Sequence, residues 1–271
     1  MSDRTGEAPL PESDDAPPGA IPTGGLGGLL LAPFREWRAA TRVPGLWRVE
    51  SRLTLAYLLR LPAWFIWRER RAAGLYAFDD ESFAFGETPY DVALDICAQA
   101  GLTASDTLFD LGCGRGKMVF AAALAHGCAA VGVDLLPTYI DVARGISAAL
   151  GLDRVRFERQ HVLDVPLDDA TAVYVNGFTF NDDLAGGLQA RISVLADGTR
   201  WISVGREWRH PRLRLSGKRR YPFSWGYADT WLYEVGPAGT PVAGDADNHP
   251  SFESVWAQTL KPADAGEEET P

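Results

Sequence analysis

Short apolar patterns typical of strands alternate with helical patterns along the middle of the chain, and this alternation most constrains the fold. The expected strands cover residues 107–111, 130–134, 154–160, 171–175, 199–204 and 230–235. The expected helices cover residues 91–100, 117–126, 138–150 and 182–194. Strands that alternate with helices of this length are typical of a parallel sheet with helices on both faces. The sequence therefore predicts an α/β fold built on a doubly wound, mostly parallel sheet.

A glycine-rich loop follows the first of these strands. The run LFDLGCGRG covers residues 108–116 and places Gly112, Gly114 and Gly116 at alternate positions. Open α/β sheets bind ligands where such strands end, and glycines let a ligand approach the main chain without a Cβ in the way. Lys117 stands where a nicotinamide-binding fingerprint needs its third glycine. The loop therefore predicts a ligand site whose spacing differs from that of dehydrogenases.

Two acidic residues lie at the ends of expected strands near this loop. Asp134, followed by Leu135, ends the strand at 130–134, where a carboxylate can accept hydrogen bonds from both hydroxyls of a ribose. Asp110 lies beside the glycine loop, where its charge repels a pyrophosphate and suits a ligand with a cationic group. S-adenosylmethionine joins a nucleoside to a cationic amino acid, so the two acids together predict this cofactor.

Over residues 85–235 the chain resembles the class I S-adenosylmethionine-dependent methyltransferases, which implies a Rossmann-like, seven-stranded sheet with an antiparallel final strand. Two segments resemble the non-SET lysine methyltransferases of the disruptor-of-telomeric-silencing type and their bacterial relatives. The run FGETPY at 85–90 is similar to that family's Y-G-E-T loop, which closes over the cofactor. The run VNGFTF at 175–180 is similar to its V-N-N-F-x-F segment beside the transferable methyl, with Gly177 in place of the second Asn.

The resemblance implies a role for each matching residue. Glu87 and Thr88 would hold the methionine end of the cofactor above Asp110 and the glycine loop. Asn176 would lie near the sulfonium and the acceptor, and Phe178 and Phe180 would line the acceptor channel. The cofactor-binding candidates are Glu87, Thr88, Asp110, Gly112, Gly114, Gly116, Asp134, Leu135, His161, Asp164 and Asn176.

Purely structural explanations stand beside these roles. Glu87 can stabilise the start of a helix through the helix macrodipole, and Asn176 can be an ordinary turn residue at a strand end. Phe178 and Phe180 can be core aromatics beneath a loop. The two acids at the strand ends can simply cap loops.

The residue that contacts the adenine amine is left open between two positions. The family usually has an acid where His161 stands in the run QHVLD at residues 160–164. A neutral His161 can accept the hydrogen bond through one ring nitrogen, or Asp164 can supply it instead. The sequence slightly favours Asp164.

The segments outside this domain differ in composition. Residues 1–30 are rich in Pro, Gly and acidic residues and predict a disordered tail, and residues 237–271 predict a mostly disordered acidic tail. Residues 31–84 predict a helical extension, with helical patterns at 33–41 and 48–71 that bend near Pro62. The methyltransferase domain is expected at residues 85–236.

Two basic segments interrupt a chain whose formal net charge is −10. Residues 35–71 carry nine arginines against three glutamates, with four tryptophans among them, and residues 206–220 carry seven cations against Glu207. These segments predict either solvated surfaces, a helical cap and a loop, or docking of an anionic partner or a membrane surface. The acidic total argues against a general nucleic-acid binder.

The remaining features narrow the class of protein. Three cysteines without a C-x-x-C pair predict neither a disulfide framework nor a zinc site, and the four histidines lack metal-ligand spacing. No segment resembles a signal peptide, and the longest apolar stretch, residues 53–67, contains Arg60 and Pro62. We expect a cytoplasmic, metal-free protein.

The function predicted from these features is methyl transfer from S-adenosylmethionine by in-line displacement, to an amine acceptor such as a protein lysine. Two alternatives remain at this point. One is a methyltransferase for small molecules, with the N-terminal helices as a substrate lid. The other is a scaffold that binds S-adenosylmethionine without turnover.

Overall fold

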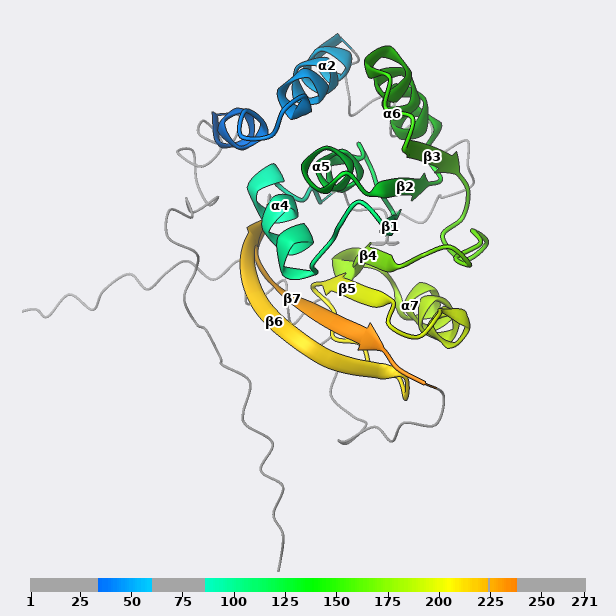
Figure 1. The fold of residues 1–271 in the computed structure, drawn as a ribbon. Helices are drawn as coiled ribbons and strands as arrows, with labels where there is room; N and C mark the ends of the chain where they lie inside the picture. The colour runs from blue at the N-terminus through cyan, green and yellow to red at the C-terminus, as the bar shows by residue number, and fades with distance from the viewer. Residues whose placement is uncertain (1–33, 60–85, 224, 238–271) are drawn as a thin grey trace, which may run out of the picture.

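Among the residues that the structure describes, seven strands form one sheet in the order β3-β2-β1-β4-β5-β7-β6 (Figure 1). The structure is a computed structural model, and it describes residues 34–59, 86–223 and 225–237. The strands are β1 (Thr107–Leu111), β2 (Ala129–Asp134), β3 (Val155–Arg159), β4 (Ala172–Asn176), β5 (Arg200–Val204), β6 (Leu213–Phe223) and β7 (Gly226–Val235). β1 to β5 pair in parallel, whereas β7 is antiparallel to both β5 and β6. The predicted α/β fold with an antiparallel final strand is confirmed.

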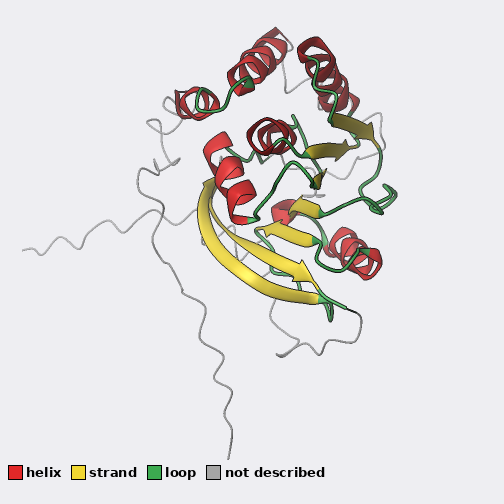
Figure 2. Cartoon of the chain, viewed as in Figure 1, coloured by secondary structure: helices red, strands yellow, loops and turns green. Residues whose placement is uncertain are grey.

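Helices cover both faces of the sheet (Figure 2). They are α2 (Leu46–Leu59), α4 (Tyr90–Gln99), α5 (Lys117–His126), α6 (Pro137–Leu150) and α7 (Asp182–Arg191), and residues 34–40 are also helical. Successive side chains of a strand point to opposite faces, so β1 sends Leu108 into the core beneath α4, α5 and α6 and sends Phe109 into a second core with Leu188 of α7. The two cores therefore fix the sheet between two helical layers.

The helix expected at residues 182–194 is shorter in the structure. α7 ends at Arg191 and continues as a single 3-10 turn over Ile192–Val194. Its first turn follows Asn181, whose side chain accepts a hydrogen bond from the Leu184 backbone N–H, as a helix N-cap does.

β6 is the strand that the periodicity analysis missed, since residues 206–220 were interpreted as a basic loop or partner surface. Most side chains from Leu213 to Arg220 are exposed or half-buried, and only Tyr221, Pro222 and Phe223 at its end are buried. β6 is an edge strand, and charged side chains are typical of edge strands because they discourage pairing with another chain. Its strand conformation comes from pairing with β7 along nearly its full length.

The N-terminal extension is helical where it is described. α2 buries Leu46, Val49, Leu53 and Tyr57 against α5 and α6. The preceding helical turn is held by Arg35, which forms a bidentate ion pair with Asp91 of α4 at 2.7 and 2.9 Å. The expected bend at Pro62, the rest of residues 60–85 and the two predicted tails beyond residues 34 and 237 lie outside the described residues.

No helix in the described ranges is long and apolar enough to cross a bilayer. In the same ranges no cluster of His, Cys, Asp and Glu side chains has the arrangement of a metal site.

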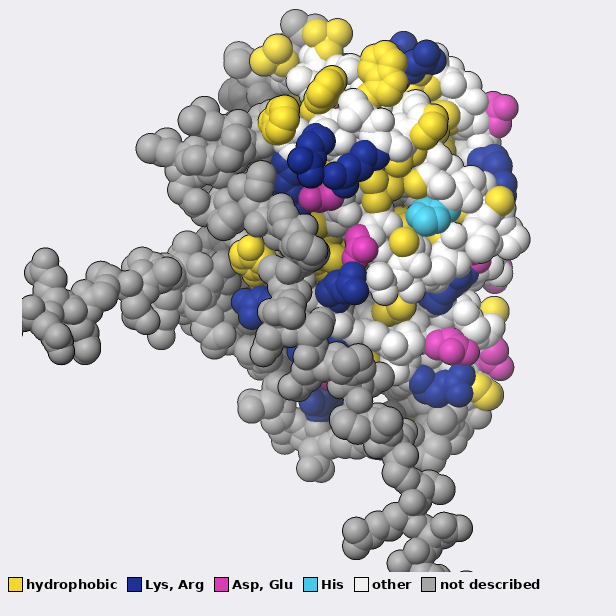
Figure 3. All heavy atoms as spheres, turned by 60° about the vertical axis from the view of Figure 1, so that its left-hand side comes forward, with side chains coloured by type: hydrophobic (Ala, Val, Ile, Leu, Met, Phe, Trp, Pro, Cys, Tyr) yellow, Lys and Arg dark blue, Asp and Glu magenta, His cyan; other side chains and the backbone are white. Residues whose placement is uncertain are grey.

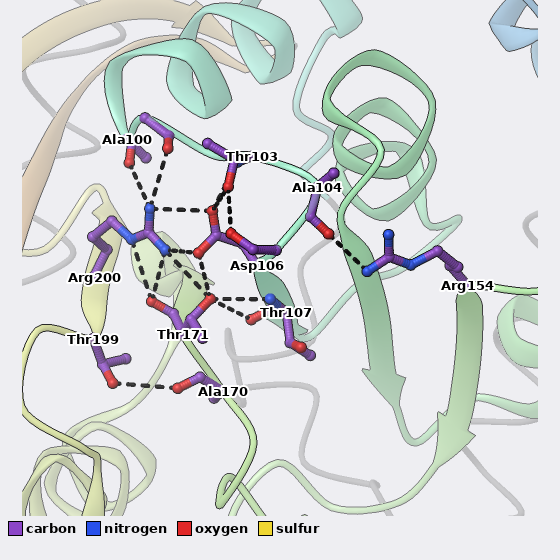
Figure 4. Close-up of polar contacts among 12 residues, drawn as sticks. Ala100, Thr103, Ala104, Asp106, Thr107, Arg154, Ala170, Thr171, Thr199 and Arg200 are labelled. Atoms are coloured by element: carbon purple, nitrogen blue, oxygen red, sulfur yellow. Dashed lines mark hydrogen bonds and ion pairs between the residues drawn. The ribbon is translucent and has the colours of Figure 1, made fainter.

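A polar cluster connects β1, β4 and β5 at their amino-terminal ends, opposite the strand ends that carry the glycine loop (Figure 4). Asp106, just before β1, accepts hydrogen bonds from the Thr103 N–H at 2.7 Å and the Thr171 hydroxyl at 2.8 Å, and it forms an ion pair with Arg200 of β5. Although burial opposes the charged form, the Arg200 guanidinium and the hydrogen bonds from both threonines lower the pKa of Asp106 to about 2. The cluster therefore stabilises the fold most when Asp106 is ionised.

We expect Asp106→Asn to lower the free energy of unfolding by about 2 kcal/mol near neutral pH. This is the free energy that corresponds to a pKa lowered from 3.8 to about 2 on folding. Because the pKa is depressed in the folded state, this contribution is complete above about pH 5 and is lost as the pH falls from about 4 toward 2. Urea unfolding of both proteins at neutral and acidic pH measures it. Asp168→Asn, at an exposed position, is the control, and a gap between the wild type and Asp106→Asn that does not shrink with acid would contradict the prediction.

Candidate active site

The glycine loop turns sharply between β1 and α5. Gly112, Gly114 and Gly116 have φ values of +87°, +50° and +82°, in the left-handed region that favours glycine. A Cβ on Gly116 would lie 2.6 Å from the Phe157 ring, so the close packing of loop and β3 also requires a glycine there. The loop backbone is bound to the end of β2, because the N–H groups of Gly112 and Cys113 both donate to the Val133 carbonyl, at 2.9 and 3.0 Å.

Asp134 lies at the tip of β2, as predicted, and supports the glycine loop directly. One carboxylate oxygen accepts the Gly114 N–H at 2.9 Å, and the other accepts the Leu136 N–H at the same distance. Each oxygen of a carboxylate has a second acceptor site, and Asp134 is only half-buried. The carboxylate can therefore hold the loop and accept hydrogen bonds from a ligand at once. Leu135, between the two contacts, is also half-buried.

Asp110 is buried near the end of β1, between Gly132 of β2 and Tyr174 of β4. Burial raises the pKa of Asp110 well above its ordinary value, and the nearby charge of Asp134 adds to the effect. A cationic group placed beside the two acids would reverse this shift by favouring the ionised form. The site is thus electrostatically suited to a ligand with a positive charge.

Glu87 forms a buried charge cluster with the two cations that flank Gly116. Arg115 makes a bidentate contact with Glu87, and the Lys117 ammonium lies 2.9 Å from both Glu87 and Glu36. These cations lower the pKa of Glu87 despite its burial, whereas burial raises the pKa of Glu36. The predicted role of Glu87 at the methionine end stays a prediction, and the structure adds that Lys117, between Glu87 and Glu36, connects the segment at residues 86–89 to the helix at residues 34–40.

Thr88 joins the segment at residues 86–89 to the sheet. Its hydroxyl lies 2.7 Å from the hydroxyl of Tyr174, which sits beside Asp110 in the register of β1 and β4. On the other side of the segment, a Cβ on Gly86 would lie 2.6 Å from the Trp225 ring. The segment is therefore held between β4 and the β6–β7 turn, next to the strand tips. Phe85, the first residue of the motif, lies outside the described residues.

Asn176 ends β4, directly across from the start of the glycine loop. Its side-chain oxygen is buried and has no hydrogen-bond partner among the described residues. Buried polar atoms are rarely left unpaired in a folded protein. The unpaired amide oxygen therefore marks a position where a ligand group is expected.

The two phenylalanines after Asn176 lie on different sides of the site. The Phe180 ring packs on the glycine loop, 3.4 Å from where a Cβ on Gly112 would be. Phe178 instead faces Trp225, with ring centroids 5.6 Å apart, and Trp225 stacks on Phe223 at 4.7 Å. Phe178, Trp225 and Phe223 form what we call the aromatic wall. Phe180 packs on the predicted cofactor loop, and Phe178 belongs to the wall.

His161 and Asp164 follow β3. The Nδ1 atom of His161 accepts a hydrogen bond from the Leu163 N–H at 3.2 Å, so the proton of a neutral ring is on Nε2, which can donate but not accept. Asp164 is exposed. Of the two candidates for the adenine amine, this arrangement favours Asp164.

Three residues at the site were missed by sequence reasoning: Glu36, Tyr174 and Trp225. Glu36 and Tyr174 reach their partners Lys117 and Thr88 across 81 and 86 positions of the chain. The sequence around Trp225 could have indicated its position, because Trp225 precedes Gly226 in a tight turn between two strands. That turn is recognised only when β6 is known to be a strand.

Comparisons with known proteins agree with this geometry. A family model described as a methyltransferase domain matches residues 102–178, which run from just before β1 to η2 (Gly177–Thr179). The chain is similar to O-methyltransferase resE of Aspergillus sclerotiorum, with 26% identity over 110 residues, or 39% of this chain. The match spans 42% of that relative, which is less than half of its length.

Two solved structures are also similar. One is an RNA methyltransferase from Salinibacter ruber in complex with S-adenosyl-L-homocysteine, with 23% identity and a TM-score of 0.45 over 58% of this chain and 99% of that one. The other is geranyl diphosphate C-methyltransferase from Streptomyces coelicolor A3(2), with 18% identity and a TM-score of 0.47 over 63% of this chain and 92% of that one.

The fold and the family match point to the same class for the central domain. The match to a methyltransferase domain covers residues 102–178, less than half of the chain, and includes the glycine loop and both strand-end acids. The predicted methyltransferase fold of this domain is confirmed. The narrower resemblance to the non-SET lysine methyltransferases stays a prediction.

Proposed function

We propose that this chain is an S-adenosylmethionine-dependent methyltransferase that methylates an amine, such as a protein lysine. The observation that carries the proposal is the buried, unpaired amide oxygen of Asn176 at the tip of β4, beside a glycine loop flanked by Asp110 and Asp134. Two acids beside a glycine loop, together with one unpaired acceptor, suit a cationic nucleoside ligand better than a phosphorylated one.

The residues present fit S-adenosylmethionine. Asp134 would accept hydrogen bonds from the ribose hydroxyls, and Asp110 with Thr88 would face the methionine end. Asp164 would accept from the adenine amine. The glycine loop has the left-handed backbone that glycine favours, and its glycines carry no side chain between the loop backbone and a ligand. When bound, S-adenosylmethionine supplies a methyl group on a sulfonium, open to in-line attack by a nucleophile.

The protein's part in the reaction is to bind, orient and exclude water. Asn176 would fix the acceptor through its amide oxygen, which accepts a hydrogen bond from an N–H group. Alignment of two reactants in this way can contribute roughly 7–11 kcal/mol of barrier lowering. Phe180 covers the loop on one side, and the aromatic wall provides an apolar surface on the other.

An amine must lose a proton before it can attack. Burial against the aromatic wall lowers the pKa of an ammonium group, because desolvation disfavours its charged form. The proton can then leave to solvent as the amine enters. The amine class itself is supported by the resemblance of residues 85–90 and 175–180 to lysine methyltransferases.

A small-molecule hydroxyl is the second candidate acceptor. Its support is the similarity to O-methyltransferase resE, which covers 110 residues. The two acceptors differ in how they lose a proton, because a hydroxyl needs a base whereas an amine can lose its proton by desolvation. Transfer to a hydroxyl gives a methyl ether, and transfer to an amine gives a methylated amine.

Incubation of the protein with methyl-labelled S-adenosylmethionine and cell lysate tests the proposal. We expect label in the protein fraction, stable to mild base as methylated amines are. Label in the metabolite fraction instead would support the hydroxyl acceptor. Cofactor binding without transfer to either fraction would overturn the enzyme proposal in favour of a binding scaffold, and absence of cofactor binding would overturn the site itself.

A further inference from the structure

The N-terminal helices expose most of the large apolar side chains that are exposed in the described residues. Phe34, Trp37, Trp47, Leu55 and Leu58 are 59%, 55%, 44%, 56% and 75% exposed, and the other two such residues, Val194 and Leu215, lie apart from one another. Figure 3 shows hydrophobic and Lys/Arg side chains intermingled on the upper part of the molecule, at the level of α2 in Figure 1. A concentration of exposed large apolar side chains on one pair of helices is typical of an interaction site.

The apolar side chains of α2 form a stripe with a basic border. At about 100° per residue, Trp47, Leu58 and Leu55 project within about 80° of one another, and Arg48 and Arg52 lie within about the next 60°. The opposite face of the helix is the one that packs on the domain, through Leu46, Val49, Leu53 and Tyr57. α2 therefore has two apolar faces, and only one of them is covered by the described residues.

The exposed charges of this surface are all positive. Arg38, Arg42, Arg48 and Arg52 are exposed and make no ion pair with a described residue. The two acids of residues 34–59 are half-buried and engaged elsewhere, Glu36 with Lys117 and Glu50 with the Thr54 hydroxyl. The surface is thus cationic and apolar at once.

The second basic segment has a different character, although its sequence is just as basic. Five of its seven cations are in ion pairs: Arg206 with Asp182, Arg212 with Asp197, Arg214 with Glu234, Lys218 with Asp229 and Arg219 with Asp95. Its charge is therefore largely balanced within the domain. Residues 206–220 provide a matched comparison for the N-terminal helices.

We propose that residues 34–58 dock this protein on an anionic lipid bilayer, with α2 lying in the interface. Trp side chains favour the boundary between headgroups and acyl chains. Arginines that border an apolar stripe can reach the anionic headgroups while their stems cover apolar surface. An acidic protein or a nucleic acid would use the arginines but would leave the stripe of Trp47, Leu55 and Leu58 in water.

The docked helices are connected to the candidate active site. Tyr57 of α2 packs against the Arg115 guanidinium in the glycine loop at 5.2 Å, and Glu36 contacts Lys117 at the start of α5. Docking therefore places the bilayer on the face of α2 opposite the one that contacts the glycine loop. The docking itself does not depend on the proposed function, because vesicle binding is measured without cofactor or acceptor.

Flotation of the full chain with vesicles tests the proposal. The vesicles contain equal parts of phosphatidylcholine and phosphatidylserine, and vesicles of phosphatidylcholine alone serve as the neutral reference. We expect binding to the anionic vesicles that weakens with salt. Arg48→Gln combined with Arg52→Gln should weaken it about thirtyfold, at about fivefold for each arginine near the surface.

Matched variants separate docking from general effects of charge or hydrophobicity. Arg214→Gln combined with Arg220→Gln removes the same charge from exposed positions of β6. These variants should change binding by less than about threefold, because charges that do not contact the bilayer act on it only over the screening distance of about 8 Å. Trp47→Ser combined with Leu58→Ser should weaken binding about tenfold or more, whereas Val194→Ser combined with Leu215→Ser should leave it unchanged.

Three outcomes would overturn the proposal. One is the absence of flotation at low salt. Another is an equal loss of binding in the β6 control and the α2 variant. The last is a concentration-dependent dimer in sedimentation that Trp47→Ser combined with Leu58→Ser dissociates, without vesicle binding by the wild type, which would assign the surface to a second copy of the chain.

Discussion

Asp134→Ala is expected to weaken binding of S-adenosylhomocysteine or S-adenosylmethionine by a hundredfold or more. The substitution removes the proposed ribose acceptor and also the hydrogen bonds from the Gly114 and Leu136 N–H groups that shape the loop. Hydrogen bonds to a charged group contribute about 1.5–3 kcal/mol each, so a loss of about 3 kcal/mol is a conservative expectation. Isothermal titration calorimetry measures the effect.

The control for this experiment is Asp168→Ala, at an exposed position before β4. It removes the same charge from the same protein and should bind the ligand like the wild type. An unchanged Kd in Asp134→Ala would remove Asp134 from the ribose site. NAD should bind neither protein, because Lys117 stands where a dinucleotide-binding loop needs its third glycine.

Asn176→Ala is expected to lower kcat by roughly 30- to 150-fold while changing cofactor affinity by less than about threefold. The proposed contact of its amide oxygen is made with the acceptor during transfer, and loss of an interaction worth about 2–3 kcal/mol in the transition state alone lowers kcat in this proportion. Single-turnover kinetics with labelled cofactor, combined with calorimetry, separates the two quantities.

Asn181→Ala is the matched control, five positions along the chain. Asn181 caps α7 through the Leu184 N–H, so its loss should lower the free energy of unfolding by about 1 kcal/mol and leave kcat unchanged. If Asn176→Ala loses cofactor affinity as strongly as turnover, Asn176 is a cofactor-binding residue and the acceptor assignment is wrong.

Sequence reasoning worked where the signal is local. β1 and α5 have the predicted bounds. An apolar strand, a glycine loop and a helix that is capped by Gly127 follow one another there without interruption. Asp110 and Asp134 were found for the same reason, since parallel strands place their carboxyl ends at one edge of the sheet. β6 was missed because its exposed, charged residues become a strand only through pairing with β7.

The contacts within the candidate site could not be predicted from local sequence patterns. The contacts of Glu87 with Arg115 and Lys117, of Thr88 with Tyr174 and of Gly86 with Trp225 join segments that are far apart in sequence. No periodicity or motif spacing encodes which side chains meet across such separations. Their partners follow from the packing of helices and strands on the sheet.

The amino-acid sequence by itself determined the alternation of strands and helices from α4 to β5, the position of the glycine loop and the acids beside it, because each depends on residues close together in the chain. Only the tertiary structure decided how the charges of the two basic segments are paired. Their composition is alike, yet five of the seven cations of residues 206–220 meet acids brought to them by neighbouring elements, whereas Arg38, Arg42, Arg48 and Arg52 meet none among the described residues. The physical reason is that a charge is neutralised by what folding places next to it, which the local sequence does not record.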